Sequence, residues 1–326
     1  MKTTVGILGA SGETGQSIVN GLFEAGNFKI IALTRPSSIS KPANQALAAR
    51  GIELRPCDLS STQEHLVNAL QGVEILISAI VATEQLAQIP LASAAKAAGV
   101  KRFLPCAFVP VIPAGGISLL RDHKEIVYNH VKQLGLPYTI LDVGWWYQLC
   151  VRKLPSGRTD YAVLNPDERI PGDGNVPSAL TDLRDIGRYA AKVIADDRTL
   201  NKNVLVYNEM WSPLQIVEHW EKISGEKLER TFVSETELKK TIESCGDDMD
   251  MQTLMVKIPA QYLISWGIRG DNQPEYAKYL GYVTSKELYP QFEPRKFEDY
   301  TQEVLDGKAP QVYEELKAKF AEMMKK

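Results

Sequence analysis

Three glycines near the start of the chain, Gly9, Gly12 and Gly15, are spaced as in loops that bind dinucleotides. They follow an apolar run, 4–8, and open a segment with helical periodicity, 14–25. There, the first glycine would permit a sharp turn, the second would let the backbone approach a phosphate, and the third would let the helix pack closely. The positive end of the helix would face the anion. A plain strand–turn–helix is the alternative. The predicted cofactor contacts are Gly9, Ser11, Gly12, Glu13, Thr14 and Gly15.

The turn after the second predicted strand, 29–34, carries Arg35, Ser38 and Lys41. An acidic residue about 20 positions beyond the glycines would hold the ribose hydroxyl of NAD. Arg35 stands there instead, twenty residues after Gly15. A guanidinium with a nearby hydroxyl and ammonium suits a 2′-phosphate. The sequence therefore predicts NADPH rather than NADH, and the alternative is a solvated loop arginine.

Five further residues are predicted to lie near the cofactor because they follow the third, fourth and fifth strands. Ligands of doubly wound sheets bind outside the carboxyl ends of the strands. Asp58 ends the third strand, so it would lie near the adenine or cap the next helix. Ala79 and Ile80 end the fourth strand, and Cys106 and Phe108 follow the fifth as predicted neighbours of the nicotinamide.

Two lysines on one predicted helix, 118–134, compete for the catalytic role. Tyr128 and Lys132 match the Tyr-x-x-x-Lys pattern of short-chain dehydrogenases, but Lys132 lies at the far end of the helix, so we interpret this match as coincidence. Lys124 lies near the helix start, closer to the predicted nicotinamide. All three side chains share one helical face, so burial must decide which points inward. A solvated stripe of lysines is the alternative.

The elements that must position these residues alternate between strand and helix over the first 145 residues. Buried parallel strands form continuous apolar runs, and helical crossovers favour parallel pairing. The pattern predicts a doubly wound α/β Rossmann sheet with strand order 3-2-1-4-5-6. The predicted strands are 4–8, 29–34, 52–55, 74–78, 101–105 and 138–143, and the predicted helices are 14–25, 43–50, 61–70, 86–98 and 118–134.

In the second half of the chain, strand and helix patterns alternate less regularly. This pattern predicts a smaller, mostly helical substrate domain. We expect the NADP-binding domain over 1–150 and the substrate domain over 151–326, with a strand at 204–207 returning to the first sheet. Pro- and Gly-rich connectors at 154–158 and 170–176 mark insertions or a domain edge. Helices are predicted over 182–195, 212–224, from the capping box Ser234-Glu235-Thr236-Glu237, and over 310–326.

Composition narrows the classes of protein. The chain has 326 residues, 44% of them hydrophobic, and a net charge of −3, with no basic block for nucleic acid or an anionic membrane. The four cysteines lack metal or redox spacing, and no signal peptide is apparent, so we expect a cytoplasmic protein without a bound metal. The expected partner is a small-molecule substrate, and the sequence does not decide whether the chain forms a homodimer.

The stretch "GVKRFLPCAF…RDHKEIVYNHVKQLGLPYT" resembles the isoflavone reductase-like branch of the atypical short-chain dehydrogenases, within the NmrA-like family. Members carry a VKRF-x-P-S-E-F strand and then a lysine eleven residues before a G-[IL]-P-Y-T motif. Lys124 and Gly135 keep that interval, and Arg35 resembles the family's NADPH arginine. Later segments such as "DIGRYAAKVIADDRTLNKNV" also resemble the family. The resemblance implies that Lys124 is the catalytic residue, acting as an acid–base or as a fixed cation.

The chain departs from the plant members on the expected substrate side. Cys106 and Ala107 replace a Ser-Glu pair, Tyr128 and Asn129 replace two arginines, and "DVGWWYQ" is similar to fungal members. The plant substrates therefore cannot be carried over. Three consecutive aromatic residues just beyond the sixth strand are predicted to form a wall for a flat substrate, the alternative being core aromatics that join two domains. They are Trp145, Trp146 and Tyr147.

The predicted activity is that of an NADPH-dependent reductase. It would transfer hydride to an aromatic or conjugated small molecule (an enone, imine or ketone) in fungal-type secondary metabolism. The alternative is a regulator of the NmrA type, which senses a dinucleotide and binds a protein partner without turnover. A positioned lysine at residue 124 favours the enzyme, because a sensor does not need one.

Overall fold

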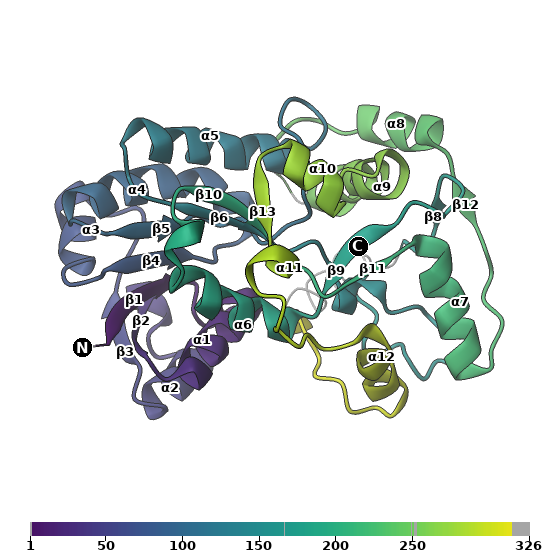
Figure 1. The fold of residues 1–326 in the computed structure, drawn as a ribbon, viewed down its shortest axis with the longest axis horizontal. Coiled ribbons are helices and arrows are strands. Elements are labelled where there is room, and N and C mark those ends of the chain that lie inside the picture. Colours follow the sequence, from purple (N-terminus) through teal and green to yellow (C-terminus); the bar gives the residue numbers. More distant parts are fainter. Residues whose placement is uncertain (1, 166, 249, 251–252, 315–326) are drawn as a thin grey trace.

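A parallel sheet forms the centre of the molecule in the computed structural model, which describes residues 2–165, 167–248, 250 and 253–314 (Figure 1). Five strands pair in the order β3-β2-β1-β4-β5, all parallel. A parallel bridge between Phe103 and Tyr138 joins β6 to β5, which completes the predicted order. The predicted fold class is therefore confirmed. The strands are β1 (Thr3–Leu8), β2 (Phe28–Thr34), β3 (Glu53–Pro56), β4 (Ile75–Ser78), β5 (Arg102–Leu104) and β6 (Thr139–Asp142).

Two strands from the second half of the chain extend the sheet beyond β6. β10 (Lys202–Leu205) pairs with β6, and β13 (Tyr282–Thr284) pairs with β10, both parallel. The sequence predicts the first of these returns. It does not predict β13, because three residues are too few to show a strand pattern.

Helices cover both faces of the sheet (Figure 1). The core on one face joins alternate residues of β1, such as Val5 and Ile7, to α1, α2 and α6. The core on the other face joins Leu8 to α3, α4 and α5. Both faces of β1 are therefore buried, as expected for a central parallel strand. The bounds are α1 (Glu13–Ala25), α2 (Pro42–Ala49), α3 (Gln63–Ala69), α4 (Gln88–Ala97), α5 (Leu119–Gln133) and α6 (Leu183–Ile194).

Helices α1 and α6 pack backbone against backbone, which fixes the helix that follows the glycine loop. A Cβ on Gly21 would lie 2.1 Å from the carbonyl carbon of Gly187, and one on Gly187 would collide with the Ser17 carbonyl. The Ser17 hydroxyl accepts the amide proton of Gly187 at 3.0 Å. The N-terminus of α1 is thus held from both sides, by β1 and by α6.

The second half of the chain combines helices with two short sheets, which the sequence does not predict. One sheet has the order β11-β9-β7, and the other pairs β12 with β8. Pro213 begins α7, and the Ser234 capping box opens α8, both as predicted. Of the helix predicted over 310–326, residues 310–313 are not helical, and 315–326 lie outside the described residues. The bounds are β7 (Trp145–Trp146), β8 (Ile170–Pro171), β9 (Ser178–Thr181), β11 (Glu209–Trp211), β12 (Phe232–Val233), α7 (Pro213–Ser224), α8 (Glu235–Glu243), α9 (Ile258–Ile264), α10 (Pro274–Tyr279), α11 (Ser285–Leu288) and α12 (Phe297–Leu305).

The lengths of the helices bear on whether the chain could cross a membrane. Among the residues that the structure describes, none of the helices is long and apolar enough to span a bilayer.

Candidate active site

The glycine loop lies between β1 and α1 with a geometry that leaves one side open. Gly9 has a φ of +79°, and a Cβ there would lie 2.4 Å from the Ala79 carbonyl. A Cβ on Gly15 would lie 2.0 Å from the Gly9 carbonyl. Gly12 differs, because a Cβ there would meet only the Gly9 oxygen, at 3.4 Å. Two glycines therefore permit packing, and the third keeps the mouth of the loop clear.

The N-terminus of α1 offers its amide protons to this mouth. Gly12 is the N-cap residue, and no side chain caps the helix. By contrast, Ser118 caps α5 and Asp182 caps α6 through side-chain oxygens. Uncapped N–H groups at a helix start attract anions such as a pyrophosphate. The residues present thus fit the phosphates of a dinucleotide, with Ser11, Glu13 and Thr14 half-buried around the loop.

The cationic residues after β2 lie on the surface, where a 2′-phosphate could reach them. Arg35 and Lys41 are exposed, and Ser38 is half-buried between them in a short 3₁₀ turn. Asp58 does not cap α3, because Thr62 does so. Instead Asp58 accepts hydrogen bonds from the Ser60 amide and hydroxyl, which lower its pKa, and the charge of Arg35 lowers it further. Arg35 and Asp58 therefore share one end of the candidate cofactor site.

Lys124 points inward from α5 to the carboxyl end of β5. Its side chain is only 2% exposed. The ammonium donates to the carbonyl oxygens of Cys106 at 2.7 Å and Ala107 at 3.1 Å, and to Oε1 of Gln85 at 3.2 Å. Lys132, two turns further along the helix, is exposed beside the ring of Tyr138. Burial thus selects Lys124 over Lys132.

Burial also sets the proton affinity of this lysine. Desolvation lowers the pKa of Lys124 below the ordinary value of 10.5. The three oxygen acceptors favour the ammonium, since a neutral amine has only two N–H groups to donate. The group is therefore a cation poised to release a proton more readily than an exposed lysine.

A buried ion pair lies beside Lys124, one turn away on the same helix. Arg121 Nη1 donates to Oδ2 of Asp142, at the end of β6, over 2.8 Å. The hydroxyl of Tyr282, from β13, donates to the same oxygen at 2.6 Å and accepts from Arg121 at 2.9 Å. Each of the three is at most 5% exposed. This Arg121–Asp142–Tyr282 cluster ties the start of α5 to the carboxyl end of β6 and to the first residue of β13.

Two further residues of α5, Asp122 in its first turn and Tyr128 in its middle, have structural surroundings. Asp122 accepts the amide protons of Gly115 and Gly116, each at 2.8 Å, and so holds the loop before α5. The ring of Tyr128 lies 5.6 Å from the Arg121 guanidinium, and its buried hydroxyl has no partner among the described residues. Burial raises the pKa of that hydroxyl well above its usual value.

The residues predicted beside the nicotinamide gather around β4 and β5. The Cys106 thiol donates to the Ile80 carbonyl at 3.4 Å and lies 3.8 Å from Lys124 Nζ. Phe108 is buried with a φ of +51°, a strained conformation for a bulky residue. Its amide donates to the Leu141 carbonyl at 2.9 Å. The structure thus brings Ala79, Ile80, Cys106, Phe108 and Lys124 together.

The predicted aromatic wall divides between the two faces of β7. Trp145 stacks on Trp266 and contacts Tyr262 of α9, with ring centroids 5.4 Å apart in both cases. Trp146 points the other way and stacks on Tyr313 at 6.0 Å. Both tryptophans are half-buried.

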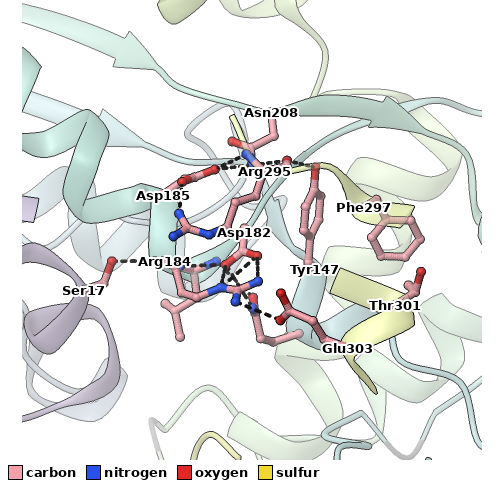
Figure 2. A network of polar contacts seen from close by, with 12 residues as sticks. Ser17, Tyr147, Asp182, Arg184, Asp185, Asn208, Arg295, Phe297, Thr301 and Glu303 are labelled. Atoms are coloured by element: carbon pink, nitrogen blue, oxygen red, sulfur yellow. Dashed lines mark hydrogen bonds and ion pairs between the residues drawn. The ribbon is translucent and has the colours of Figure 1, made fainter. Parts of the chain in front are cut away.

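Tyr147 does not belong to the wall, and this prediction needs correction. Its side chain is fully buried against Phe297 and Tyr300 of α12. The hydroxyl donates to Glu209 at 2.8 Å. It also lies 3.2 Å from the Arg295 carbonyl oxygen (Figure 2). It therefore packs as a core aromatic, because strand geometry ends at residue 146 and the next turn directs the ring inward.

Figure 2 shows that Tyr147 is part of a larger polar network around the start of α6. Asp182 accepts from Arg184, which also pairs with Glu303 of α12. Asp185 accepts from both the amide and the guanidinium of Arg295. These contacts join the sheet to the second half of the chain.

Sequence reasoning missed several residues of the site because they come from distant segments. Gln85, in the 3₁₀ turn Ala82–Ala87, orients the Lys124 ammonium. Tyr262 approaches from α9, and Tyr313 from beyond α12. Arg121 is the exception, because the sequence around it could have indicated its position. It lies three residues before Lys124 and therefore on the same buried face of the predicted helix.

Comparison with known proteins places this geometry in a family. Residues 1–301 match the NmrA-like family model. Asnovolin J 5′,6′-dehydrogenase of Aspergillus novofumigatus is 46% identical over 313 residues, which cover 93% of this chain and 95% of that protein. Phenylcoumaran benzylic ether reductase TP7 of Nicotiana tabacum is 28% identical, over 92% and 97% of the two chains. The chain belongs to the NmrA-like family.

Solved structures agree with this assignment. The complex of leucoanthocyanidin reductase from Vitis vinifera with NADPH superposes with a TM-score of 0.79 at 26% identity, over 93% of this chain and 99% of the other. AtPrR2 with NADP⁺ and (+)-pinoresinol gives a TM-score of 0.76 at 25% identity, with the same coverage. The predicted isoflavone reductase-like class, an oxidoreductase that uses NADPH, is confirmed at the level of the family.

Proposed function

We propose that this chain transfers hydride between NADPH and an aromatic or conjugated small molecule, with Lys124 as the catalytic residue. The observation that carries the proposal is the buried Lys124 ammonium, held by three oxygens at the carboxyl end of β5. The resemblance to reductases of secondary metabolism supports the class of reaction.

The chain's own residues would orient the cofactor along the carboxyl edge of the sheet. The amide groups at the start of α1 would bind the pyrophosphate, and Arg35 and Lys41 the 2′-phosphate. Ala79, Ile80, Cys106 and Phe108 would contact the nicotinamide end. When bound there, NADPH supplies the hydride, and the protein supplies position and charge.

Lys124 would stabilise or protonate the oxygen on which negative charge develops. Two of its three acceptors are backbone carbonyls of Cys106 and Ala107, fixed by the strand end. The third acceptor, the Gln85 side chain, has the longest contact, and it would have to leave its bonds to the Val81 carbonyl and Gln88 in order to move aside. A substrate oxygen would then take the place of Gln85 Oε1. A preorganised ammonium in a site with little water stabilises such charge strongly.

The substrate would lie between the Rossmann half and α9. Trp145 remains the proposed aromatic contact on this side, and Tyr262 joins it because its ring meets Trp145 edge to face. Trp146 remains a proposed contact on the other face of β7, beside Tyr313. Asnovolin J 5′,6′-dehydrogenase is named for dehydrogenation, and the plant relatives are named for reduction. Both directions of hydride transfer should therefore be assayed with this chain.

The test is turnover with a panel of aromatic enones, imines and ketones, and of their reduced forms. In Lys124→Met, we expect kcat to fall by about 10³-fold, as for loss of a general acid, while the Kd for NADPH stays within twofold. Lys132→Met is the matched control on the exposed part of the same helix and should retain full activity. Undiminished turnover in Lys124→Met would overturn the proposal. Tight NADPH binding with no turnover across the panel would favour the regulator.

A further inference from the structure

The segment that follows α12 returns across the molecule to the glycine loop. Ala309 is buried in the core of the second half, beside α12. Three residues later, Val312 packs against the core cluster that contains Cys106 and Phe108. The backbone amide of Tyr313 then donates to Glu13 Oε1 over 2.8 Å, a contact between residues 300 positions apart.

Tyr313 has partners on both sides of the candidate cofactor site. Its ring is parallel to that of Trp146, with centroids 6.0 Å apart and planes inclined by 6°. Burial raises the pKa of its hydroxyl, the charges of Glu13 and Cys106 add to this, and a hydrogen bond with Thr14 opposes it. Glu13 and Thr14 belong to the glycine loop, whereas Cys106 follows β5. The phenol therefore lies between the loop and the strand end.

The backbone at this point is held in an unfavourable conformation. Tyr313 has a φ of +56°, in the left-handed region that residues with a Cβ rarely adopt. Such strain persists where surrounding contacts over-determine the conformation. Here the contacts are the Glu13 hydrogen bond and the Trp146 stack, so loss of either would favour release of the segment.

We propose that residues 309–313 form a strap that closes the nicotinamide end of the cofactor site, with Tyr313 as the group that must move aside before NADPH binds fully. The inference rests on the proposed function, because the residues that Tyr313 contacts are those proposed to hold the cofactor. Tyr313 lies beyond residue 301, where the match to the family model ends.

The strap would affect the two halves of NADPH differently. The residues proposed to hold the adenosine end are Arg35, Ser38 and Lys41. In the described part of the chain, the contacts of Tyr313 are instead with Glu13 and Trp146. A ligand that lacks the nicotinamide should bind whether the strap is closed or open. A ligand that contains it binds only the open state, so its apparent Kd rises by the inverse of the open fraction.

The test is calorimetric titration with NADPH and with adenosine 2′,5′-bisphosphate. If the strap is open about a tenth of the time, Tyr313→Ala should bind NADPH about tenfold more tightly than the wild-type chain and the bisphosphate equally well. Tyr313→Phe keeps the stacking ring and should stay close to wild type. Tyr279→Ala removes an exposed tyrosine of α10 and should change neither ligand.

Hydrogen exchange gives a second readout that does not depend on activity. NADPH should accelerate exchange in the peptide that contains the Tyr313 amide, because that amide loses its bond to Glu13, and the bisphosphate should not. Weaker or unchanged NADPH binding in Tyr313→Ala, or slower exchange with NADPH, would overturn the strap alone. Failure of the bisphosphate to bind the wild-type chain would overturn the proposed cofactor site, and the strap with it.

Discussion

The two ends of the candidate site are built by different means. At the carboxyl end of β1, the chain offers backbone amides and three glycines within seven consecutive residues, with Arg35 on an exposed turn nearby. At the carboxyl ends of β5 and β6, it buries Lys124, Arg121 and Asp142, whose partners come from segments up to 161 residues away. The cofactor end therefore depends on local conformation, and the chemical end on tertiary packing.

The largest expected effect is a loss of stability when the buried cluster at the chemical end is disrupted. Asp142→Asn keeps an oxygen near Arg121 and Tyr282 but removes the charge that balances a buried guanidinium. We expect the free energy of unfolding to fall by about 3–5 kcal/mol, measured by urea denaturation. Glu235→Gln is the control, since its pair with Lys239 is exposed and screened by solvent, and its loss should change stability much less. An equal loss of unfolding free energy in the two variants would show that the buried cluster stabilises the fold no more than an exposed ion pair does.

The next prediction distinguishes the roles of two glycines at the cofactor end, Gly15 in packing and Gly12 in binding. Gly15→Ala places a Cβ 2.0 Å from the Gly9 carbonyl and should lower the free energy of unfolding by about 1–3 kcal/mol. Gly12→Ala meets nothing closer than 3.4 Å, so it should fold normally yet bind NADPH at least about tenfold more weakly, because the methyl group occupies the phosphate mouth. Unfolding curves and calorimetry distinguish these outcomes. Normal NADPH binding by a folded Gly12→Ala protein would contradict the cradle.

These two ends also differ in how far the sequence predicts them. Strand, turn and helix at 4–25 carry their own signals, so the glycine loop and its place in the sheet follow from periodicity and spacing. Lys124 could be placed on the correct helix, but its direction depends on burial, which i, i+4, i+8 spacing alone leaves open. Tertiary packing had to decide between Lys124 and Lys132.

Contacts over long separations could not be predicted. Tyr282 meets Asp142 from a strand of three residues, and Tyr313 meets Glu13 across 300 positions. No local pattern marks such partners. The same limit explains the wrong prediction for Tyr147. It is aromatic like the two tryptophans before it, and only the turn of the backbone after β7 directs its ring into the core.

A smaller effect tests cofactor choice at the exposed end. Arg35→Ala should weaken NADPH binding about tenfold, as expected for loss of a charge-assisted contact to phosphate, and leave NADH binding unchanged. Lys41→Ala should show a weaker change in the same direction, since a lysine contributes a point charge without the guanidinium fork. The measurement is the ratio of the two dissociation constants. A ratio that Arg35→Ala leaves unaltered would place the selection for NADPH elsewhere.

The smallest effect is a pH dependence at the chemical end. If the Lys124 ammonium is the active form, kcat is constant while the group is protonated and falls as the pH rises through its pKa. Desolvation lowers that pKa, so the decline should begin below pH 10.5, the ordinary lysine value, and approach tenfold per pH unit. Lys124→Arg stays protonated and should lose this decline. A decline that persists in Lys124→Arg would assign it to another group.

The most direct test of the whole account measures kcat and the Kd for NADPH side by side in Arg35→Ala and Lys124→Met. We predict that Arg35→Ala raises the Kd and leaves kcat at saturating NADPH nearly unchanged, whereas Lys124→Met lowers kcat by about 10³-fold and leaves the Kd within twofold. A single variant that alters both quantities equally, with the fold intact, would contradict the division of the site into a cofactor end and a chemical end.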